Sequence, residues 1–447
     1  MKTINRILVA GILLSAVLQS CSGMKDSGHQ TRPVIPETSD PDPDTPDGDK
    51  DKLVVGSAGE VLAPWVKGSL DIHFINTGRG ESTFYVLPDG TTMLVDMAGS
   101  LLTEAESGGK LPTAPKPDAS VSSGKVIVSY INHFTSERSR GHIDYAMLSH
   151  YHEDHMGTYR TTLPDGGDGS FKLTSFAEVG VLLPYRHYLD RDWPDFNYPS
   201  GMTAAKFTNV KNFVKWSIST NGTVASAFDA GKLNQIELQY DKAAYPDFRI
   251  QNLSANGYYW TGIGEGSRRN TPETFSSSDA VPDENTLSCA FKLTYGSFDF
   301  YTGGDHQYQG RSTYPYKDSE AMLVPVIGDI DVAKADHHGT NNTNDKALMK
   351  AAAPKVWIDH VWRDVQPNPS TIDNVLYGSP DCDIFLTNLA DVNEAKFSAA
   401  QKAAMCSVSG HVCVRVNKKG TEYYVYVLDD NDMKYVVKSV HGPYKCK

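Results

Sequence analysis

The residues best suited to chemistry stand in one short run, His-Tyr-His-Glu-Asp-His at positions 150–155. Three imidazoles and a carboxylate this close together can converge on metal ions, which dispersed histidines cannot do. The run follows an apolar segment that predicts a β-strand, and ligand-binding loops commonly begin where a strand ends. An irregular turn there can direct His150 and His152 to one ion, and Asp154 and His155 to a second, as in a dinuclear centre. The alternative is a surface histidine cluster that binds no metal.

This spacing resembles the His-x-His-x-Asp-His signature of the metallo-β-lactamase superfamily. Within that superfamily, the order of motifs is similar to the extracytoplasmic hydrolase domain of the ComEC competence proteins and its free-standing relatives. Ile72–Ser82 looks like their first strand and glycine turn, and Met93–Asp96 resembles their Leu-Ile-Asp motif, whose aspartate, here Asp96, supports the histidine loop. The likeness runs from about Leu70 to Asp391. It implies an α/β fold, the αββα sandwich, in which two mixed sheets pack together with helices on the outer faces and with loop insertions.

The same resemblance supplies the remaining metal ligands. The segment 302–305, Thr-Gly-Gly-Asp, corresponds to the family's Thr-Gly-Asp with one extra glycine, so Asp305 is expected to bridge both metals. A carboxylate suits that position because it has two oxygens to share, and a loop-capping role is the alternative. His337-His338-Gly339 resembles the family's His-His-Gly motif. We expect His337 to complete the second metal site and His338 to face the substrate, where an imidazole can stabilise charge or protonate a leaving oxygen; the opposite order is the alternative. The predicted ligands are His150, His152, Asp154, His155, Asp305 and His337.

Two departures from the family bear on the substrate pocket. Many superfamily members have another histidine ligand between the histidine run and the bridging aspartate, and His187 is the only histidine in that interval. ComEC-like chains have an asparagine instead, which matches Asn285, so we interpret His187 as a loop or pocket residue and expect an open first metal. The family's Gly-His-Pro motif corresponds here to a segment with Gln366 and Asn368, which become pocket candidates. Loss of that histidine implies either lost activity or a different substrate.

The resemblance implies hydrolysis by a metal-bound hydroxide, with Asp154, His338 and Asn285 as catalytic residues. Two divalent ions are expected; zinc suits the histidine-rich ligand set, and manganese is the alternative because carboxylates contribute. By analogy with ComEC-like relatives, a phosphodiester is the expected scissile bond. The alternatives are hydrolysis of a lactone, β-lactam or other carboxyl ester or amide, and a metal-containing surface binding protein without catalysis.

The N-terminus carries a sorting signal. Two basic residues precede an apolar run at 7–17, and Leu-Gln-Ser-Cys at 18–21 resembles the bacterial lipobox, whose cysteine is acylated. We therefore expect a lipoprotein signal peptide at 1–20 and lipidation at Cys21. The remainder would be anchored in the bacterial cell envelope, outside the cytoplasm. An uncleaved membrane anchor is the alternative.

Composition divides the rest of the chain. Residues 21–52 are rich in aspartate and proline, which predicts an extended acidic tether. We expect one metallo-β-lactamase-like domain at 53–447, with its core at about 70–391, insertions over the site at about 164–285 and a C-terminal extension at about 392–447. Loss of the signal peptide changes the formal charge from −12 to −14, since two basic residues leave with it. An acidic surface disfavours tight binding of duplex DNA, so the expected partners are the membrane, through the lipid, and a small phosphodiester or other small substrate.

Apolar runs between turn residues alternate with helical patterns along the domain, which indicates a layered α/β architecture. Strands are expected at 70–76, 82–87, 92–96, 144–149, 177–183, 287–295, 297–302, 332–335, 356–358 and 384–386, and helices at 125–134, 204–216, 345–352 and 394–406. Cys289 is expected to be a buried free thiol. Two of the last four cysteines are expected to form a disulfide, with Cys406 and Cys413 the nearest pair in sequence. His306, beside the bridging aspartate, is expected to be exposed.

Overall fold

The computed structural model describes residues 53, 55–308 and 313–447. The chain divides into two units, Met1–Lys50 and Asp51–Lys447, and every described residue belongs to the second unit. The predicted signal peptide, Cys21 and the acidic tether lie outside the described residues. Within the described part, none of the helices combines the length and the apolar character that crossing a lipid bilayer requires.

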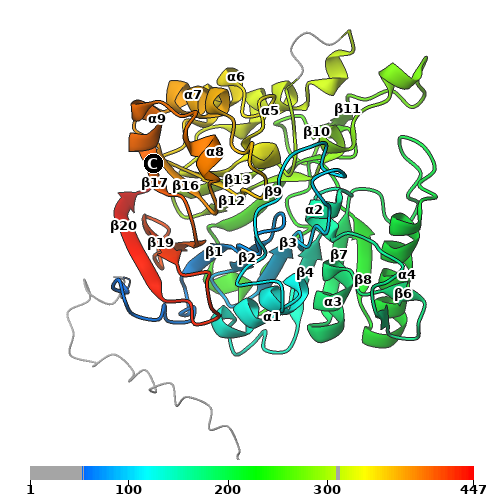
Figure 1. Cartoon of the computed structure of the whole chain (residues 1–447), viewed down its shortest axis with the longest axis horizontal. Coiled ribbons are helices and arrows are strands. Elements are labelled where there is room, and N and C mark those ends of the chain that lie inside the picture. The colour runs from blue at the N-terminus through cyan, green and yellow to red at the C-terminus, as the bar shows by residue number, and fades with distance from the viewer. Residues whose placement is uncertain (1–52, 54, 309–312) are drawn as a thin grey trace, which may run out of the picture. The chain divides into compact units, whose positions relative to one another are not determined.

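Two large mixed sheets and one short strand pair contain the strands of the described part (Figure 1). In spatial order, the first sheet contains β20 (Val437–Lys445), β19 (Glu422–Leu428), β18 (His411–Val416), β1 (Leu70–Phe74), β2 (Thr83–Val86), β3 (Thr92–Val95), β4 (Ile143–Met147), β7 (Tyr185–Asp190) and β8 (Val224–Ala227). The second sheet contains β11 (Ser267–Arg269), β10 (Tyr258–Trp260), β9 (Phe248–Ala255), β12 (Ala290–Tyr295), β13 (Phe298–Thr302), β14 (Val332–Lys334), β15 (Val356–Asp359), β16 (Asp383–Leu386) and β17 (Met405–Ser407). The short pair is β5 (Asp165–Gly166) with β6 (Phe171–Lys172). In the first sheet β3, β4 and β7 are parallel, and in the second sheet β13 to β16 are parallel.

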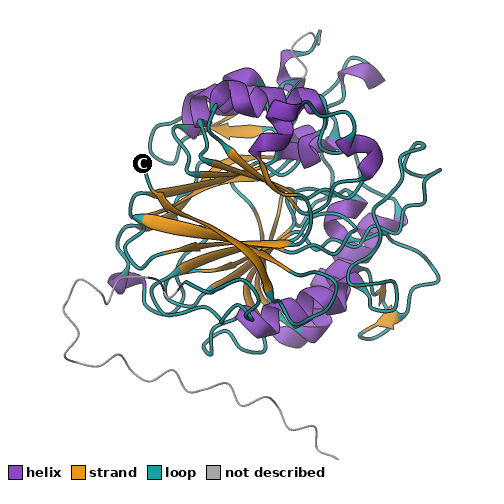
Figure 2. Ribbon diagram, turned by 60° about the vertical axis from the view of Figure 1, so that its left-hand side comes forward, coloured by secondary structure: helices purple, strands orange, loops and turns teal. Residues whose placement is uncertain are grey.

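Side chains that alternate along the strands separate two hydrophobic layers. In β2, Phe84 and Val86 belong to the layer on the outer face of the first sheet, whereas Tyr85 belongs to the layer between the sheets. There the Tyr85 ring meets Phe291 and Phe300 of the second sheet, with ring centroids 6.0 and 5.8 Å apart. The two sheets therefore pack face to face, as Figure 2 shows.

Helices cover the outer face of each sheet (Figures 1 and 2). The first sheet is covered by α1 (Ser123–Phe134), α3 (Ser175–Leu182) and α4 (Ala205–Asn221). The second is covered by α5 (Ser319–Ile327), α6 (Lys346–Ala352) and α7 (Pro369–Gly378). The shorter helices are α2 (Glu153–Met156), α8 (Asp391–Glu394) and α9 (Ala399–Ala404). The layers follow the order helix, sheet, sheet, helix, and the predicted αββα sandwich is confirmed.

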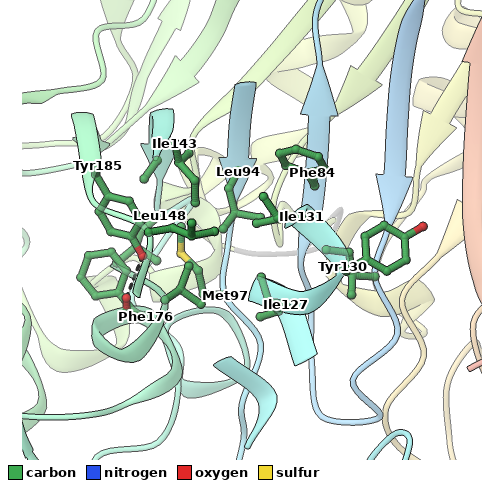
Figure 3. Packing of buried hydrophobic residues seen from close by; sticks show 14 of the residues in the cluster. Phe84, Leu94, Met97, Ile127, Tyr130, Ile131, Ile143, Leu148, Phe176 and Tyr185 are labelled. Atoms are coloured by element: carbon green, nitrogen blue, oxygen red, sulfur yellow. Dashed lines mark hydrogen bonds between the residues drawn. The ribbon is translucent and has the colours of Figure 1, made fainter. Parts of the chain in front are cut away.

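The first helix, α1, illustrates how the sequence builds an outer layer. Its buried residues recur every three or four positions, which places an apolar stripe with Ile127 and Ile131 on one face. Figure 3 shows both residues packed in one cluster with Phe84 and Leu94 of the first sheet. The Ser122 side chain begins the helix by accepting a hydrogen bond from a backbone N–H of the first turn.

Two predicted elements differ in the structure. The strand predicted at 177–183 is wrong, because this segment forms α3 and packs against α1. A short apolar run has no period that separates a buried strand from a buried helix, and β7 occupies the parallel position beside β4. The helix predicted at 394–406 is broken, since α8 ends at its first residue, α9 covers its middle and β17 covers its end.

The regions predicted as insertions and as an extension contribute strands to both sheets. Residues 164–285 supply β7 and β8 to the first sheet and β9 to β11 to the second. Residues 392–447 supply β17 to the second sheet and β18 to β20 to the first. Pairing with β18 satisfies the backbone groups of β1 that would otherwise form an open sheet edge.

The cysteines of the described part are all free, so the predicted disulfide is wrong. Cys406 lies on β17 and Cys413 on β18, which belong to different sheets. The two cysteines are close in sequence but lie in different sheets, because the chain crosses from one sheet to the other between them. Cys289 is a buried free thiol, as predicted, and burial raises its pKa well above the ordinary value.

Candidate metal centre

The chemistry-bearing side chains meet at one edge of the sandwich, where parallel strands of both sheets end. The histidine run follows β4 and continues into α2, and Asp96 follows the neighbouring strand β3. Asp305 follows β13, and His337 and His338 lie in a turn, Asp336–Gly339, that follows β14. Carboxyl ends of parallel strands share an edge, so segments far apart in the sequence reach one site.

The Asp305 carboxylate lies at the centre of the site. Its Oδ2 atom is 3.2 Å from His155 Nε2 and 3.6 Å from His150 Nε2. The same atom is 3.8 Å from Nε2 of both His337 and His338. Asp305 is 1% exposed, yet neither carboxylate oxygen has a hydrogen-bond partner, and His155 Nε2 has none either. Buried polar atoms without partners are costly, and this convergence of ligand atoms fits divalent cations held between them.

Two sets of possible ligand atoms share Asp305, and within each set the atoms lie within 4.8 Å of one another. The first set is His150, His152 and Asp305, and the second is Glu81, His155, Asp305 and His338. Asp154 adjoins the second set, with Oδ2 3.1 Å from His338 Nε2 and 4.0 Å from His155 Nε2. A carboxylate shared by two histidine sets suits two divalent ions side by side.

Hydrogen bonds on the outer side of two histidine rings direct their inner nitrogens to the centre. His155 Nδ1 donates to Asp96 Oδ2 at 2.8 Å, and His338 Nδ1 donates to the backbone oxygen of His360 at 2.8 Å. A carbonyl oxygen only accepts, so the proton of a neutral His338 ring is on Nδ1 and the lone pair is on Nε2. A backbone or carboxylate partner of this kind is the usual support of a metal-binding histidine.

Asp96 holds the histidine loop from behind. Its oxygens accept hydrogen bonds from the backbone N–H and the hydroxyl of Ser149, at 2.8 and 2.7 Å, as well as from His155. Asp96 has φ 59°, a left-handed conformation that non-glycine residues seldom adopt. One carboxylate therefore positions both the start of the histidine loop and one ring within it.

Burial or neighbouring charges lower the pKa values of Asp305, Asp154 and His150. Burial alone would raise the pKa of Asp305 and of Asp154, but the surrounding histidines hold both pKa values well below the ordinary range. Burial lowers the pKa of His150 well below its ordinary value. Ionised carboxylates and neutral imidazoles are the forms that bind metal ions.

The extra glycine before Asp305 is explained by a lack of space. A Cβ atom at Gly303 would lie 2.2 Å from the Tyr301 hydroxyl oxygen and 2.3 Å from Asp336 Oδ1. Gly304 has φ +59°, which glycine adopts without strain. The two glycines together let the chain turn sharply from β13 into the centre.

His337 and His338 occupy different positions, although both have positive φ, 46° and 52°. His338 is buried and belongs to the second ligand set. The His337 side chain is 24% exposed, and its ring nitrogens lie within 3.4 Å of Asn285 Nδ2 and 3.3 Å of Thr340 Oγ1. Burial of the ring lowers the pKa of His337 to about 4. His338 thus belongs to a set of possible ligand atoms and His337 lies at the surface of the site, whereas the motif predicted His337 as the ligand.

A pocket of about 140 Å³ opens over the centre. It is lined by Lys110, Asp154, His337, His338, Thr340, Asn341, Asn342, Arg363, Val365 and Gln366. Val365 is the single apolar residue of this lining, so the pocket suits a polar ligand.

The predicted pocket residues lie in three different environments. Gln366 lines the pocket, and its side-chain oxygen accepts a hydrogen bond from the backbone of Arg363. Asn368 caps the start of α7 with its side chain and is not part of the lining. His187 stacks on Tyr145 of the neighbouring strand, with ring centroids 4.9 Å apart, and is not part of the lining either. The structure brings only the first of these to the site.

Asn285 and His306 flank the centre. Asn285 Nδ2 lies 3.3 Å from His337 Nε2, and its Oδ1 is buried without a hydrogen-bond partner. His306 is completely buried, so the expectation of an exposed neighbour is wrong. Its ring packs against β9, where Nε2 lies 2.6 Å from Ser254 Oγ, and burial lowers the pKa of His306 to about 3.

Comparison with known proteins gives fold-level likenesses at low identity. No protein-family model matches the sequence, and no curated protein matches it. A protein from Parabacteroides distasonis described as a metal-dependent hydrolase is 11% identical, with 71% of this chain and 92% of that chain covered and a TM-score of 0.33. Zn²⁺-bound PqqB from Methylobacterium extorquens is 10% identical, with 77% and 99% covered and a TM-score of 0.35. A Thermotoga maritima protein described as a zinc-dependent hydrolase of the metallo-β-lactamase superfamily is 9% identical, with 65% and 74% covered and a TM-score of 0.24. These TM-scores lie below 0.5, so these likenesses carry no argument about function.

Glu81 is a site residue that sequence reasoning missed. It is buried, with Oε2 2.9 Å from Lys334 Nζ, while Oε1 has no hydrogen-bond partner. Lys334 Nζ also donates to the backbone oxygen of Gly304 at 3.1 Å, so a buried cation supports the turn into the centre. Glu81 ends the glycine turn of the motif at 72–82, and that position is the signal that could have identified it.

A buried ion pair that sequence reasoning also missed supports the histidine run. Arg191 Nε and Nη2 donate to the two carboxylate oxygens of Glu284 at 2.8 and 2.7 Å. Glu284 also accepts the backbone N–H of Tyr151 at 2.9 Å, and the guanidinium lies 4.6 Å from the centre of the Tyr151 ring. The pair joins the region predicted as an insertion to the backbone between His150 and His152, two of the predicted ligands. No local sequence pattern indicates such a contact.

Proposed function

We propose that this chain is a metal-dependent hydrolase with a dinuclear centre that cleaves phosphodiester bonds. The Asp305 carboxylate carries the proposal, because it is buried without a hydrogen-bond partner among the ring nitrogens of four histidines. Neutral imidazoles and carboxylates suit zinc, with manganese as the alternative. We assign the first ion to His150, His152 and Asp305, and the second to Asp154, His155, Asp305 and His338, with Glu81 beside it.

The chain's own residues would then orient the substrate and the attacking water. Two divalent cations bound here would supply Lewis-acid catalysis and stabilise charge on the attacked group. Asp154 lines the pocket and can orient the attacking water by accepting a hydrogen bond from it. His337 is the partly exposed imidazole of the pocket and can donate a hydrogen bond to a substrate oxygen. The amide of Asn285, 3.3 Å from His337 Nε2, orients that ring.

Two observations support a phosphodiester as the scissile bond. The order of motifs resembles the ComEC-like hydrolase domains, and the pocket lining is polar and carries two cationic side chains. Charged phosphate oxygens suit such a lining better than an apolar acyl group does. The acidic chain as a whole would repel long polyanions, which favours a small phosphodiester over duplex DNA.

Metal content combined with a substrate panel tests the proposal. The purified chain, loaded with zinc or manganese, would be assayed with bis-(p-nitrophenyl) phosphate, p-nitrophenyl phosphate, a chromogenic lactam and a chromogenic lactone. We expect the diester to be the best substrate and its turnover to stop when the metal is removed. Cleavage of the lactam or lactone without cleavage of the diester would show that the substrate is a carboxyl ester or amide and not a phosphodiester. A fully metallated chain that cleaves nothing would point to a binding protein.

We further propose that the chain is a lipoprotein anchored through Cys21 in the cell envelope, on the basis of the Leu-Gln-Ser-Cys motif. The Cys21→Ser chain should remain unprocessed or become soluble, because the residue that receives the lipid is lost. Intact mass and partitioning into detergent would be measured in cells that acylate lipoproteins. Cys406→Ser, which alters a thiol of the folded part, is the control and should change neither property. Unchanged mass and partitioning for Cys21→Ser would contradict the anchor.

A further inference from the structure

Two cationic side chains of the pocket have no ionic partner. Lys110 and Arg363 both line the pocket, and among the described residues neither forms an ion pair. Asp154, which we assign to the metal centre, is the single acidic residue of the lining. The formal net charge of the chain is −12. Two unpaired cations in one small pocket therefore differ in sign from the charge of the chain as a whole.

Arg363 contacts the Trp362 ring, which in turn contacts a histidine of the proposed metal centre. Its guanidinium is 4.0 Å from the centre of the Trp362 ring, and the Trp362 ring meets the His338 ring edge-on, with centroids 6.3 Å apart. The indole therefore contacts both the guanidinium and the ring of a proposed metal ligand. Stacking on an aromatic face holds a guanidinium in place while its donors stay available.

Backbone hydrogen bonds hold the two cations on neighbouring segments. The N–H of Thr113 donates to the oxygen of Trp362 at 2.8 Å, and the N–H of Asp364 donates to the oxygen of Leu111 at 2.9 Å. The nearby carboxylate of Asp364 accepts the N–H of Leu111 at 3.1 Å and is not part of the pocket lining. The segment that ends at Lys110 and the segment after β15 thus form one wall of the pocket.

We propose, resting on the proposed function, that Lys110 and Arg363 bind a second anionic group of the substrate. This group would be a carboxylate or a phosphate, joined by a short linker to the phosphate that lies at the metal centre. A guanidinium and an ammonium are the side chains that bind such oxyanions. The pocket volume of about 140 Å³ means that only a small group of the substrate fits inside it.

Binding of a matched phosphonate pair tests this inference without turnover. 3-Phosphonopropanoate and propylphosphonate have the same three-carbon chain on phosphorus, but only in the first is the terminal carbon a carboxylate. Isothermal titration of the zinc-loaded chain should give about tenfold to hundredfold tighter binding of 3-phosphonopropanoate, since charged hydrogen bonds add this much. Ethane-1,2-diyl bisphosphonate, which has the same two-methylene linker, distinguishes in a third titration a preference for a phosphate-like group from a preference for a carboxylate.

Variants connect the preference to the two cations. The double variant Lys110→Gln with Arg363→Gln should lower the affinity ratio to near unity while its zinc content stays that of the parent chain. Arg249→Gln, which removes an exposed arginine of β9, is the matched control and should leave the ratio unchanged. Equal affinities in the parent chain, or an unchanged ratio in the double variant, would overturn the inference. A preserved ratio in a chain that cleaves no diester would contradict the proposed function and leave the anion site standing.

Discussion

The Asp305→Asn chain is expected to bind at most about one metal ion where the parent chain binds about two, and to lose about a thousandfold in phosphodiester turnover. The carboxylate lies between the two ligand sets, with Oδ2 within 3.8 Å of four histidine nitrogens. An asparagine removes one negative charge and replaces one oxygen by a donor that cannot bind a cation. Two divalent ions held close together would then repel each other without compensation. Metal content after dialysis, measured by elemental mass spectrometry, gives the result.

A buried aspartate at the other end of β14 supplies the control. Asp331 is 1% exposed, as Asp305 is, but precedes the strand whose far end leads into the centre. Asp331→Asn should keep both ions, even if it lowers stability, and circular dichroism would establish that both variants are folded. Two ions retained by Asp305→Asn would refute the bridging role and with it the proposed dinuclear centre.

Alanine variants of the two neighbouring histidines are expected to lose different properties. His338→Ala should lose about one of the two ions, because the buried ring faces Asp154 and Asp305 with its Nε2. His337→Ala should keep both ions but lose about a hundredfold in kcat, because a hydrogen-bond donor to the substrate is removed. The two variants remove the same side chain from adjacent positions, so each is the control for the other. Metal content and steady-state kinetics of both chains decide the assignment.

The opposite distribution of metal loss between the two variants would reverse the assignment of the histidines. Loss of metal from His337→Ala with retention in His338→Ala would restore the order that the motif predicted. Both assignments would fail if the two variants kept full metal content and activity. Asn342→Ala, at another position of the pocket lining, should leave the metal content unchanged and shows whether cavity formation alone disturbs the centre.

Much of the fold followed from local patterns. Short apolar runs bounded by turn residues correctly indicated β1 to β4 and β12 to β16, since pleated strands alternate or bury both faces. The run at 177–183 failed because a short apolar segment carries no period, and packing against α1 decided its conformation. Residues 164–285 lack clear patterns because strands such as β8 and β11 are only partly buried and therefore carry no apolar run.

The sequence by itself determined which segments could carry ligands. The spacing at 150–155 is local, and each further ligand segment follows an apolar strand, so parallel strands bring their ends to a common edge. Only the tertiary structure decided which side chain faces which atom. The positions of His337 and His338 depend on two left-handed backbone turns, and the approach of Glu81 depends on Lys334 from the opposite sheet. Spacing along the chain limits which side chains can reach the site. Backbone turns and packing between the sheets decide which of them contact one another, and no local sequence pattern indicates these contacts.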